Sequence, residues 1–317
     1  LHAGHEVTAL ARPASRSPFA SIADHPRLHI ARGDLRDPRS LEGTFDGIDV
    51  VVHLAATKAG DFATQFAGTV LGTEHLLEAI AGTSVTRLVA ISTFSVYDYP
   101  SRPAGSTIDE QFPTAVDSRR LDEYAQTKLI QERLYRDAMD DLEVVILRPG
   151  MIYGRGELWH ALLGGELGPL FLRIGFRATL PMTYVENCAE AIVAAIDAPG
   201  VAGETINIVD DDLPSQSEYV KALAARTDVP TSIPIPWPVM KGAATVVAKV
   251  NDRWWGGRAK FPGIAVPEKL DGRFKPFLYS NAAAKRLLGW APRYTLPEAF
   301  DRSLGDVDLV AERALGA

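Results

Sequence analysis

Cysteine is almost absent from this sequence, since Cys188 is the single one among 317 residues. One thiol excludes an internal disulfide framework and is typical of a reducing compartment. The sequence also has no uninterrupted apolar run near the roughly 20 residues that span a bilayer. Its first residues lack the charged start and long apolar stretch of a secretory signal. We therefore expect a cytoplasmic protein without a membrane span.

An excess of positive charge is lacking as well. Lys and Arg number 33 against 40 Asp and Glu, which gives a formal net charge of -7. This balance argues against nucleic acid or an anionic membrane surface as the main partner, although it leaves room for local basic sites. The apolar and charged fractions, 46% and 23%, are those of an ordinary globular protein. We expect a small-molecule substrate and no metal site.

Short apolar runs alternate with helix-sized segments over the first two thirds of the chain. Residues 49–56 are apolar almost throughout, as expected of a parallel strand buried on both faces. Such alternation indicates βαβ units with right-handed crossovers, and hence an α/β fold with a doubly wound parallel sheet. Further strands are expected at 7–10, 28–31, 87–92, 142–150 and 205–209, and helices at 72–80, 124–139, 188–198, 215–227 and 280–292.

The helix at 124–139 begins with a Tyr-x-x-x-Lys run, Tyr124 to Lys128. This spacing puts a phenol and an ammonium one turn apart on the same helix face. An isolated tyrosine has a pKa of about 10, and a lysine cation nearby favours the phenolate and brings the group closer to a useful range for proton transfer. Ser92 and Thr93 end the apolar run before this helix and offer a hydroxyl partner. We therefore expect a hydroxyl-Tyr-Lys site that interconverts an alcohol and a ketone.

Several short motifs occur in one order along nearly the whole chain. They are Gly33-Asp34-Leu35, His53-Leu54-Ala55-Ala56, Ser92-Thr93 with Val96-Tyr97, Tyr124 to Lys128, Arg148-Pro149-Gly150 with Tyr153-Gly154, and Leu287, Gly289, Trp290 and Pro292. In this order they resemble the extended short-chain dehydrogenase/reductase family, the NAD(P)-dependent epimerase/dehydratase group. The resemblance implies a Rossmann-like fold with a smaller C-terminal substrate lobe, and an enzyme that uses NAD(P).

The same resemblance implies roles for individual residues. Tyr124 is expected to be the general acid/base, Lys128 to bind the nicotinamide ribose and lower the tyrosine pKa, and Thr93, with Ser92 beside it, to hydrogen-bond the substrate oxygen. The other expected cofactor contacts are Arg12, Asp34, Leu35, Leu54, Ala55, Ala56, Pro149, Gly150, Met151 and Ile152. The expected substrate contacts are Thr57, Tyr153 and Tyr184.

Two departures from the family pattern concern the cofactor. The family's opening strand and GxxGxxG turn, which bring a helix N-terminus to the pyrophosphate, are absent. We expect roughly 25–30 further residues at the start of the natural protein, and poor dinucleotide binding without them. The acidic residue that usually ends the second strand is also absent, and Ala11 and Arg12 stand there with Arg16 nearby. Because a cation suits the 2′-phosphate of NADP, we expect NADP rather than NAD.

We expect residues 1–155 to form the NAD(P)-binding domain, with 183–210 returning to it, and residues 156–182 and 211–317 to form mainly the substrate lobe. Residues 180–187 are more similar to the 3-beta-hydroxysteroid dehydrogenase branch than to nucleotide-sugar epimerases. An apolar lining suits a hydrophobic ketone or alcohol; the side chains expected there are Met151, Trp159, Phe171, Phe176, Trp254 and Trp255. A nucleotide-sugar epimerase or dehydratase, and a non-catalytic NAD(P) sensor, are the alternatives.

A short apolar helix is expected near 239–250, bracketed by Lys241 and Lys249. It is too short to span a membrane, and it suits a core helix of the second lobe, a substrate lid or an interfacial helix. The family resemblance also implies a homodimer formed through the helix that carries Tyr124.

Overall fold

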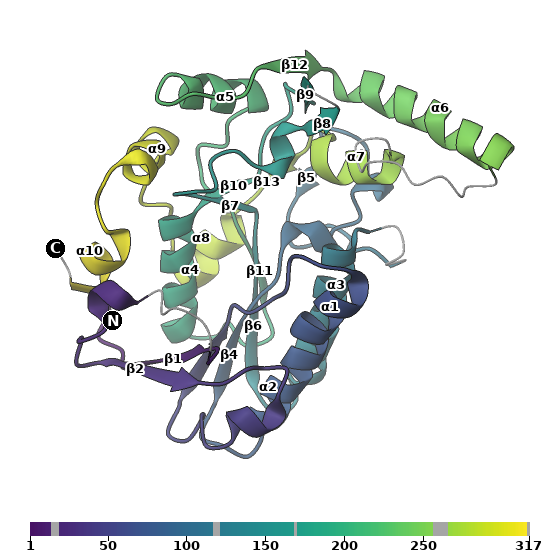
Figure 1. Cartoon of the computed structure of the whole chain (residues 1–317). Helices are drawn as coiled ribbons and strands as arrows, with labels where there is room; N and C mark the ends of the chain where they lie inside the picture. The colour runs from purple at the N-terminus through teal and green to yellow at the C-terminus, as the bar shows by residue number, and fades with distance from the viewer. Residues whose placement is uncertain (14–18, 117–120, 168–169, 256–265, 316–317) are drawn as a thin grey trace.

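The apolar runs form a parallel sheet in the computed structural model (Figure 1), which describes residues 1–13, 19–116, 121–167, 170–255 and 266–315. Four strands lie in the order β11-β6-β4-β3, and every pairing between them is parallel. These strands span Thr205–Ile208, Glu143–Pro149, Arg87–Ile91 and Val50–His53 respectively. Parallel neighbours need crossover connections, so helices come to cover both faces of the sheet.

Side chains of β4 alternate between the two faces of this sheet, as the pleat requires. Leu88 and Ala90 pack on one face with α2 (Gly72–Ile80) and with Tyr135 of α3 (Glu123–Asp137). Val89 packs on the opposite face with α4 (Val185–Asp197) and α8 (Ala282–Leu288). Helices on both faces confirm the doubly wound α/β fold. Helix α8 lies in a region that the sequence assigned mainly to the substrate lobe, yet it packs on the sheet.

Strands β1 (Val7–Ala11) and β2 (Leu28–Arg32) form a second, two-stranded parallel sheet. Among the described residues, no ladder joins β1 to β3. Val50 and Val52 of β3 are only half-buried, whereas the sequence predicted a strand buried on both faces. That prediction was wrong for these two residues because β3 is the edge strand of its sheet.

The chain beyond β6 builds smaller sheets and further helices. β7 (Met151–Tyr153) pairs with β10 (Met182–Tyr184), and β9 (Leu170–Ile174) lies between β8 (Gly165–Leu167) and β12 (Ser232–Ile235). β5 (Thr107–Ile108) pairs with β13 (Leu278–Tyr279). The remaining helices are α1 (Phe62–Phe66), α5 (Gln216–Ala224), α6 (Trp237–Trp255), α7 (Pro267–Phe274), α9 (Leu296–Leu304) and α10 (Leu309–Leu315).

Helix α6 is longer than the sequence predicted. It runs for 19 residues, from Trp237 to Trp255, instead of the expected 239–250. In the part of the chain that the structure describes, no helix is both long enough and apolar enough to cross a bilayer.

Candidate active site

The site lies where β4 ends and α3 begins. Thr93 follows β4 in an extended conformation, and its Oγ1 accepts a hydrogen bond from the Ser95 N–H at 3.2 Å. Asp122 caps α3 in the same manner, because its Oδ1 accepts from the Ala125 N–H at 3.0 Å. The cap starts the helix at Glu123, so Tyr124 belongs to the first turn. Two capping side chains therefore fix the two backbone segments that carry Thr93 and Tyr124.

The structure places the Thr93 hydroxyl near the Tyr124 phenol. Burial raises the pKa of Tyr124 to about 12; the nearby Thr93 hydroxyl lowers it, and the Asp122 carboxylate raises it. The phenol is therefore protonated at neutral pH. In this state it can donate its proton to an oxygen atom placed beside it.

Lys128 lies one turn further along α3 and is buried. Its ammonium donates hydrogen bonds to the Ile91 carbonyl and to Gln131 Oε1, and Gln131 Nε2 donates to Thr73 Oγ1 at 2.7 Å. Burial lowers the pKa of Lys128 to about 7, against the opposing effect of the Glu132 carboxylate. The sequence predicted that this lysine lowers the tyrosine pKa. In the structure that pKa is raised by burial of the phenol, and Lys128 is not among the groups that shift it.

Ser92 is directed away from Tyr124, into a buried ion pair. Its Oγ donates to Glu132 Oε1. The same carboxylate binds Arg148 in a fork, with distances of 2.8 Å to Nε and 2.7 Å to Nη2, and both side chains are at most 2% exposed. Arg136 adds a third contact to Glu132 at 3.1 Å. The expectation that Ser92 hydrogen-bonds the substrate is therefore corrected, since its hydroxyl is engaged by Glu132.

Sequence reasoning missed both partners of this ion pair, although a signal for Glu132 was present. Tyr124, Lys128 and Glu132 follow one another at intervals of four residues, which places all three on one face of α3. Because Tyr124 and Lys128 face the end of the sheet, the third member of the series faces it too. Arg148 had no such signal, since its partner lies on another element.

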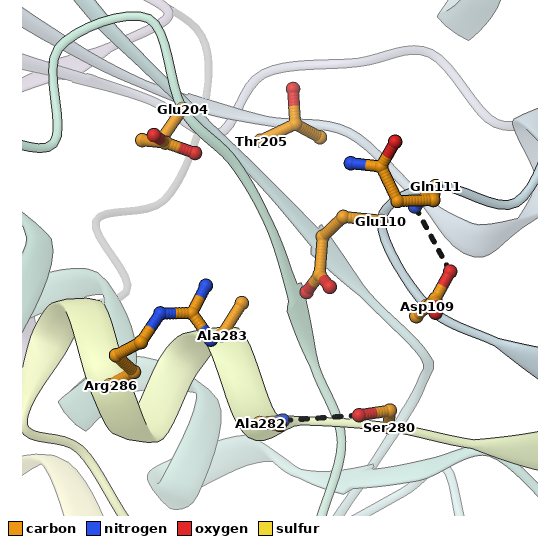
Figure 2. Close-up of a pocket in the computed structure, with 9 residues that line it drawn as sticks. All are labelled: Asp109, Glu110, Gln111, Glu204, Thr205, Ser280, Ala282, Ala283 and Arg286. Carbon is orange, nitrogen blue, oxygen red and sulfur yellow. Dashed lines mark hydrogen bonds between the residues drawn. The ribbon is translucent and has the colours of Figure 1, made fainter.

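The buried network continues from Arg148 to a cleft at the edge of the sheet. The guanidinium lies over the Tyr97 ring, 4.8 Å from its centroid. Tyr97 Oη donates to Asn207 Oδ1 at 2.6 Å, and the Asn207 N–H donates to Glu110 Oε1 at 2.9 Å. Figure 2 shows the cleft that Glu110 lines, with Arg286 of α8 on another wall. Burial raises the pKa of Glu110. None of the residues found to line this cleft is an expected site residue.

The segment after β3 combines exposed and anchored residues. Leu54 is 63% exposed and Ala55 is also exposed, while Ala56 is half-buried. The Thr57 N–H donates to Thr69 Oγ1 at 2.9 Å. A Cβ at Gly68 would lie 1.9 Å from Thr57 Oγ1, so the hydroxyl sits directly against the π-helical turn Ala67–Leu71. Thr57, an expected substrate contact, is thus held by this turn, whereas Leu54 and Ala55 are open to a ligand.

The ends of β1 and β2 carry the residues expected near the adenine. The Arg36 guanidinium forms an ion pair with the Asp34 carboxylate, in which Nη2 lies 2.6 Å from Oδ2. Hydrogen bonds from Arg36 lower the pKa of Asp34 to about 2, and the charge of Arg12 contributes in the same direction. Arg12 and Asp34 are therefore near one another. Leu35 packs into the core beside α2 and accepts a bond at its carbonyl from His75.

The turn after β6 requires glycine. A Cβ at Gly150 would lie 2.2 Å from the Pro181 carbonyl oxygen, and the Met151 N–H donates to the same oxygen at 2.6 Å. Pro149 is buried, Met151 is half-buried and Ile152 is 36% exposed. Ile152 is the member of this group most open to a ligand.

Two expected substrate contacts are core residues in the structure. Tyr153 and Tyr184 are at most 1% exposed and belong to one aromatic cluster. Tyr184 Oη donates to Glu186 Oε1 at 2.7 Å, and Tyr153 lies near the Asp210 carboxylate. Their assignment as substrate contacts is corrected, because both side chains are enclosed in the core.

The arrangement of a strand-end threonine, a helix-borne tyrosine and a lysine agrees with a comparison to protein families. The model of the NAD dependent epimerase/dehydratase family matches residues 1–209, more than half of the chain. This protein belongs to that family. It is an NAD(P)-dependent enzyme of the extended short-chain dehydrogenase/reductase type, as the sequence motifs predicted.

The proteins to which this chain is similar include dehydrogenases and an epimerase. The 3 beta-hydroxysteroid dehydrogenase/Delta 5-->4-isomerase of Mycobacterium tuberculosis is 29% identical, over 96% of this chain and 84% of its own length. The dTDP-6-deoxy-L-talose 4-dehydrogenase (NAD(P)(+)) of Kitasatospora kifunensis is 28% identical, over 94% of this chain and 87% of its own length. The structure of the UDP-glucuronic acid 4-epimerase of Bacillus cereus, solved with NAD, matches with a TM-score of 0.67 and 20% identity. The match covers 95% of this chain and 89% of that chain. At that identity the last similarity shows a shared fold.

Proposed function

We propose that this enzyme interconverts a secondary alcohol and a ketone on a small apolar substrate. The nearness of the Thr93 hydroxyl to the Tyr124 phenol carries the proposal. Two hydroxyls side by side can hold one substrate oxygen, and a phenol that stays protonated at neutral pH can donate to it. Both relatives described above with the highest identity carry the word dehydrogenase in their names.

The proton chemistry follows from these positions. The nicotinamide, when bound, supplies or accepts the hydride. In ketone reduction a C–H bond forms at the carbonyl carbon, the π electron pair moves to oxygen, and that oxygen takes the proton of Tyr124 Oη. Thr93 Oγ1 hydrogen-bonds the same oxygen and orients it. Lys128, one turn away, favours the phenolate that remains when the lysine is protonated. Alcohol oxidation is the reverse sequence.

The cofactor contacts are part of the same proposal. Leu54 and Ala55 are exposed just beyond the end of β3, and Ile152 is exposed in β7, which follows the end of β6. Ligands of open α/β sheets bind outside the carboxyl ends of the parallel strands. Arg12 stands near Asp34 and supports a preference for the 2′-phosphate of NADP. Equal turnover with NAD and NADP contradicts that preference.

A further strand is proposed to complete the sheet between β1 and β3. The separation of the two parallel sheets at this point and the half-buried Val50 and Val52 support it. Such a strand and its glycine turn would add the pyrophosphate contacts that the described residues do not offer. Titration of NADPH into residues 1–317 and into a form with the added strand tests this; equal, strong binding by both refutes it.

A nucleotide-sugar epimerase or dehydratase is the second candidate, supported by the fold shared with UDP-glucuronic acid 4-epimerase. It uses the same proton relay but returns the hydride to the same substrate. The enzyme is therefore tested with apolar ketones and with nucleotide sugars, while nicotinamide absorbance and product chirality are followed. Net NADPH consumption with a ketone supports the oxidoreductase. Turnover of a sugar without net absorbance change supports the epimerase, and no turnover of either class supports a non-catalytic sensor.

A further inference from the structure

Helix α6 extends from the body of the protein at one end of the molecule (Figure 1). Its inner face packs on β9 and α7: Ala244 is buried with Leu172, Ile174, Leu270 and Phe274. Lys241 anchors it further, because its Nζ lies 2.6 Å from Asp271 Oδ2. The helix is thus a fixed part of the fold along this inner face.

The outer face of α6 is apolar as well, which is unusual for a surface helix. Val239, Val246, Val250 and Trp254 are 61%, 61%, 41% and 77% exposed. Their spacing of seven, four and four residues aligns them in one stripe along the helix. We call these four residues the outer stripe. An exposed, contiguous apolar stripe of this kind marks an interaction surface.

Positive charge accompanies the outer stripe. Lys249 and Arg253 are exposed and occupy the same side of the helix as Val246 and Val250 in the burial pattern. Asp252 is the one acidic residue in the sequence of α6, against Lys241, Lys249 and Arg253. Salt screens charges beyond about 8 Å at physiological ionic strength, so this local cationic edge, and not the net charge of -7, governs what approaches the stripe.

We propose that the outer stripe docks on an anionic lipid surface, with α6 lying in the plane of the interface. An apolar face with aromatic and basic residues is the pattern of interfacial helices. A second copy of the chain fits less well. A helix of 19 residues is roughly 28 Å long and about 10 Å wide, which gives about 280 Å², against about 800 Å² per partner in a stable interface. Pairing two copies would also bring cationic edges together.

Docking through α6 would place the reaction site near the lipid. Arg273 of α7, the helix that packs on α6, lies 3.5 Å from Asp122, the residue that caps α3 just before Tyr124. An apolar substrate dissolved in the bilayer would then meet the protein close to the phenol. This consequence rests on the proposed function; the docking itself does not.

The test is sedimentation of the full chain with vesicles of phosphatidylcholine alone or mixed with phosphatidylglycerol. Binding to the mixed vesicles is expected to be stronger and to weaken as salt is raised. Val246→Asp should reduce it at least about tenfold, since a carboxylate enters both the apolar face and the anionic field. Val193→Asp is the matched control, because Val193 is an exposed valine, 39%, on helix α4. It should leave binding within about twofold.

Circular dichroism and thermal unfolding establish that Val246→Asp is folded. If it is not, the double change Lys249→Glu and Arg253→Glu replaces it, and loss of the preference for phosphatidylglycerol is expected. Absence of sedimentation with either vesicle overturns the proposal, as does equal loss in Val193→Asp. A dimer in light scattering that Val246→Asp dissolves, without vesicle binding, assigns the outer stripe to a second copy instead.

Discussion

Glu132→Gln should destabilise this enzyme far more than an equivalent change in an exposed ion pair. The Arg148 guanidinium is 2% exposed and makes both of its short contacts, at 2.7 and 2.8 Å, with the Glu132 carboxylate. The amide keeps one acceptor oxygen and turns an NH₂ group toward a cation. Loss of one partner of a buried pair costs about 3–5 kcal/mol, because the other charge stays in the interior without compensation.

The control for this change is Glu143→Gln. Glu143 pairs with Arg87 at 2.7 Å, but its side chain is 52% exposed, so a loss of about 0–1 kcal/mol is expected. Urea unfolding of both variants and the wild type measures the difference. The double variant Glu132→Leu with Arg148→Met should recover much of the lost stability, since no charge is left buried. A loss below about 1 kcal/mol for Glu132→Gln, or one equal to that of the control, refutes the reasoning.

Three further predictions concern single residues near the site. Ser92→Ala should lower the free energy of unfolding in urea by about 1.5–3 kcal/mol and change kcat little. Thr93→Ala should lower the free energy of unfolding by about 1 kcal/mol, because the cap is lost, and should lower kcat roughly a hundredfold or more. The reverse pattern contradicts the roles assigned to the two hydroxyls. Lys128 has a pKa of about 7 in the folded protein, against 10.5 ordinarily. Between pH 7 and 10.5 the folded state therefore binds fewer protons at this lysine than the unfolded state does. The free energy of unfolding of the wild type consequently rises with pH over this range. The advantage of Lys128→Met over wild type in urea unfolding should therefore shrink as pH rises from 7 to 10, and a constant difference contradicts it. Gly150→Ala should lower the free energy of unfolding by a few kcal/mol, because its Cβ meets a carbonyl oxygen at 2.2 Å. Gly242→Ala is the control: it has open space around it and should stabilise α6 by about 0.5–1 kcal/mol. Equal effects of the two changes contradict the packing argument.

The strands and main helices were predictable because their signals are local. The apolar runs at β4 and β6 and the helical spacing of α2 do not depend on distant residues, and their alternation defined the fold class. The edge position of β3 was not predictable in this way, since it depends on which strand lies beside it. The sequence predicted that Val50 and Val52 are buried. They are half-buried in the structure because β3 is an edge strand.

The site residues were likewise predictable only as far as local signals reach. The pairing of Thr93 with Tyr124 follows from the family order of motifs, but Ser92 and Thr93 are neighbours, and the sequence alone could not say which hydroxyl faces the phenol. The answer depends on Glu132, whose carboxylate takes the Ser92 hydroxyl. Tyr153 had the sequence character of a site residue and is a core residue, because the rings that enclose it, Tyr219 and Phe300, come from much later in the chain.

The central claim, that Tyr124 is the proton donor of an alcohol–ketone interconversion, is tested most directly by Tyr124→Phe. The variant keeps the ring and loses only the hydroxyl that lies near Thr93. The measurement is kcat for ketone reduction together with the Kd for NADPH. The account predicts that kcat falls roughly 10²–10⁴-fold while the Kd changes little. Turnover retained by Tyr124→Phe would contradict it.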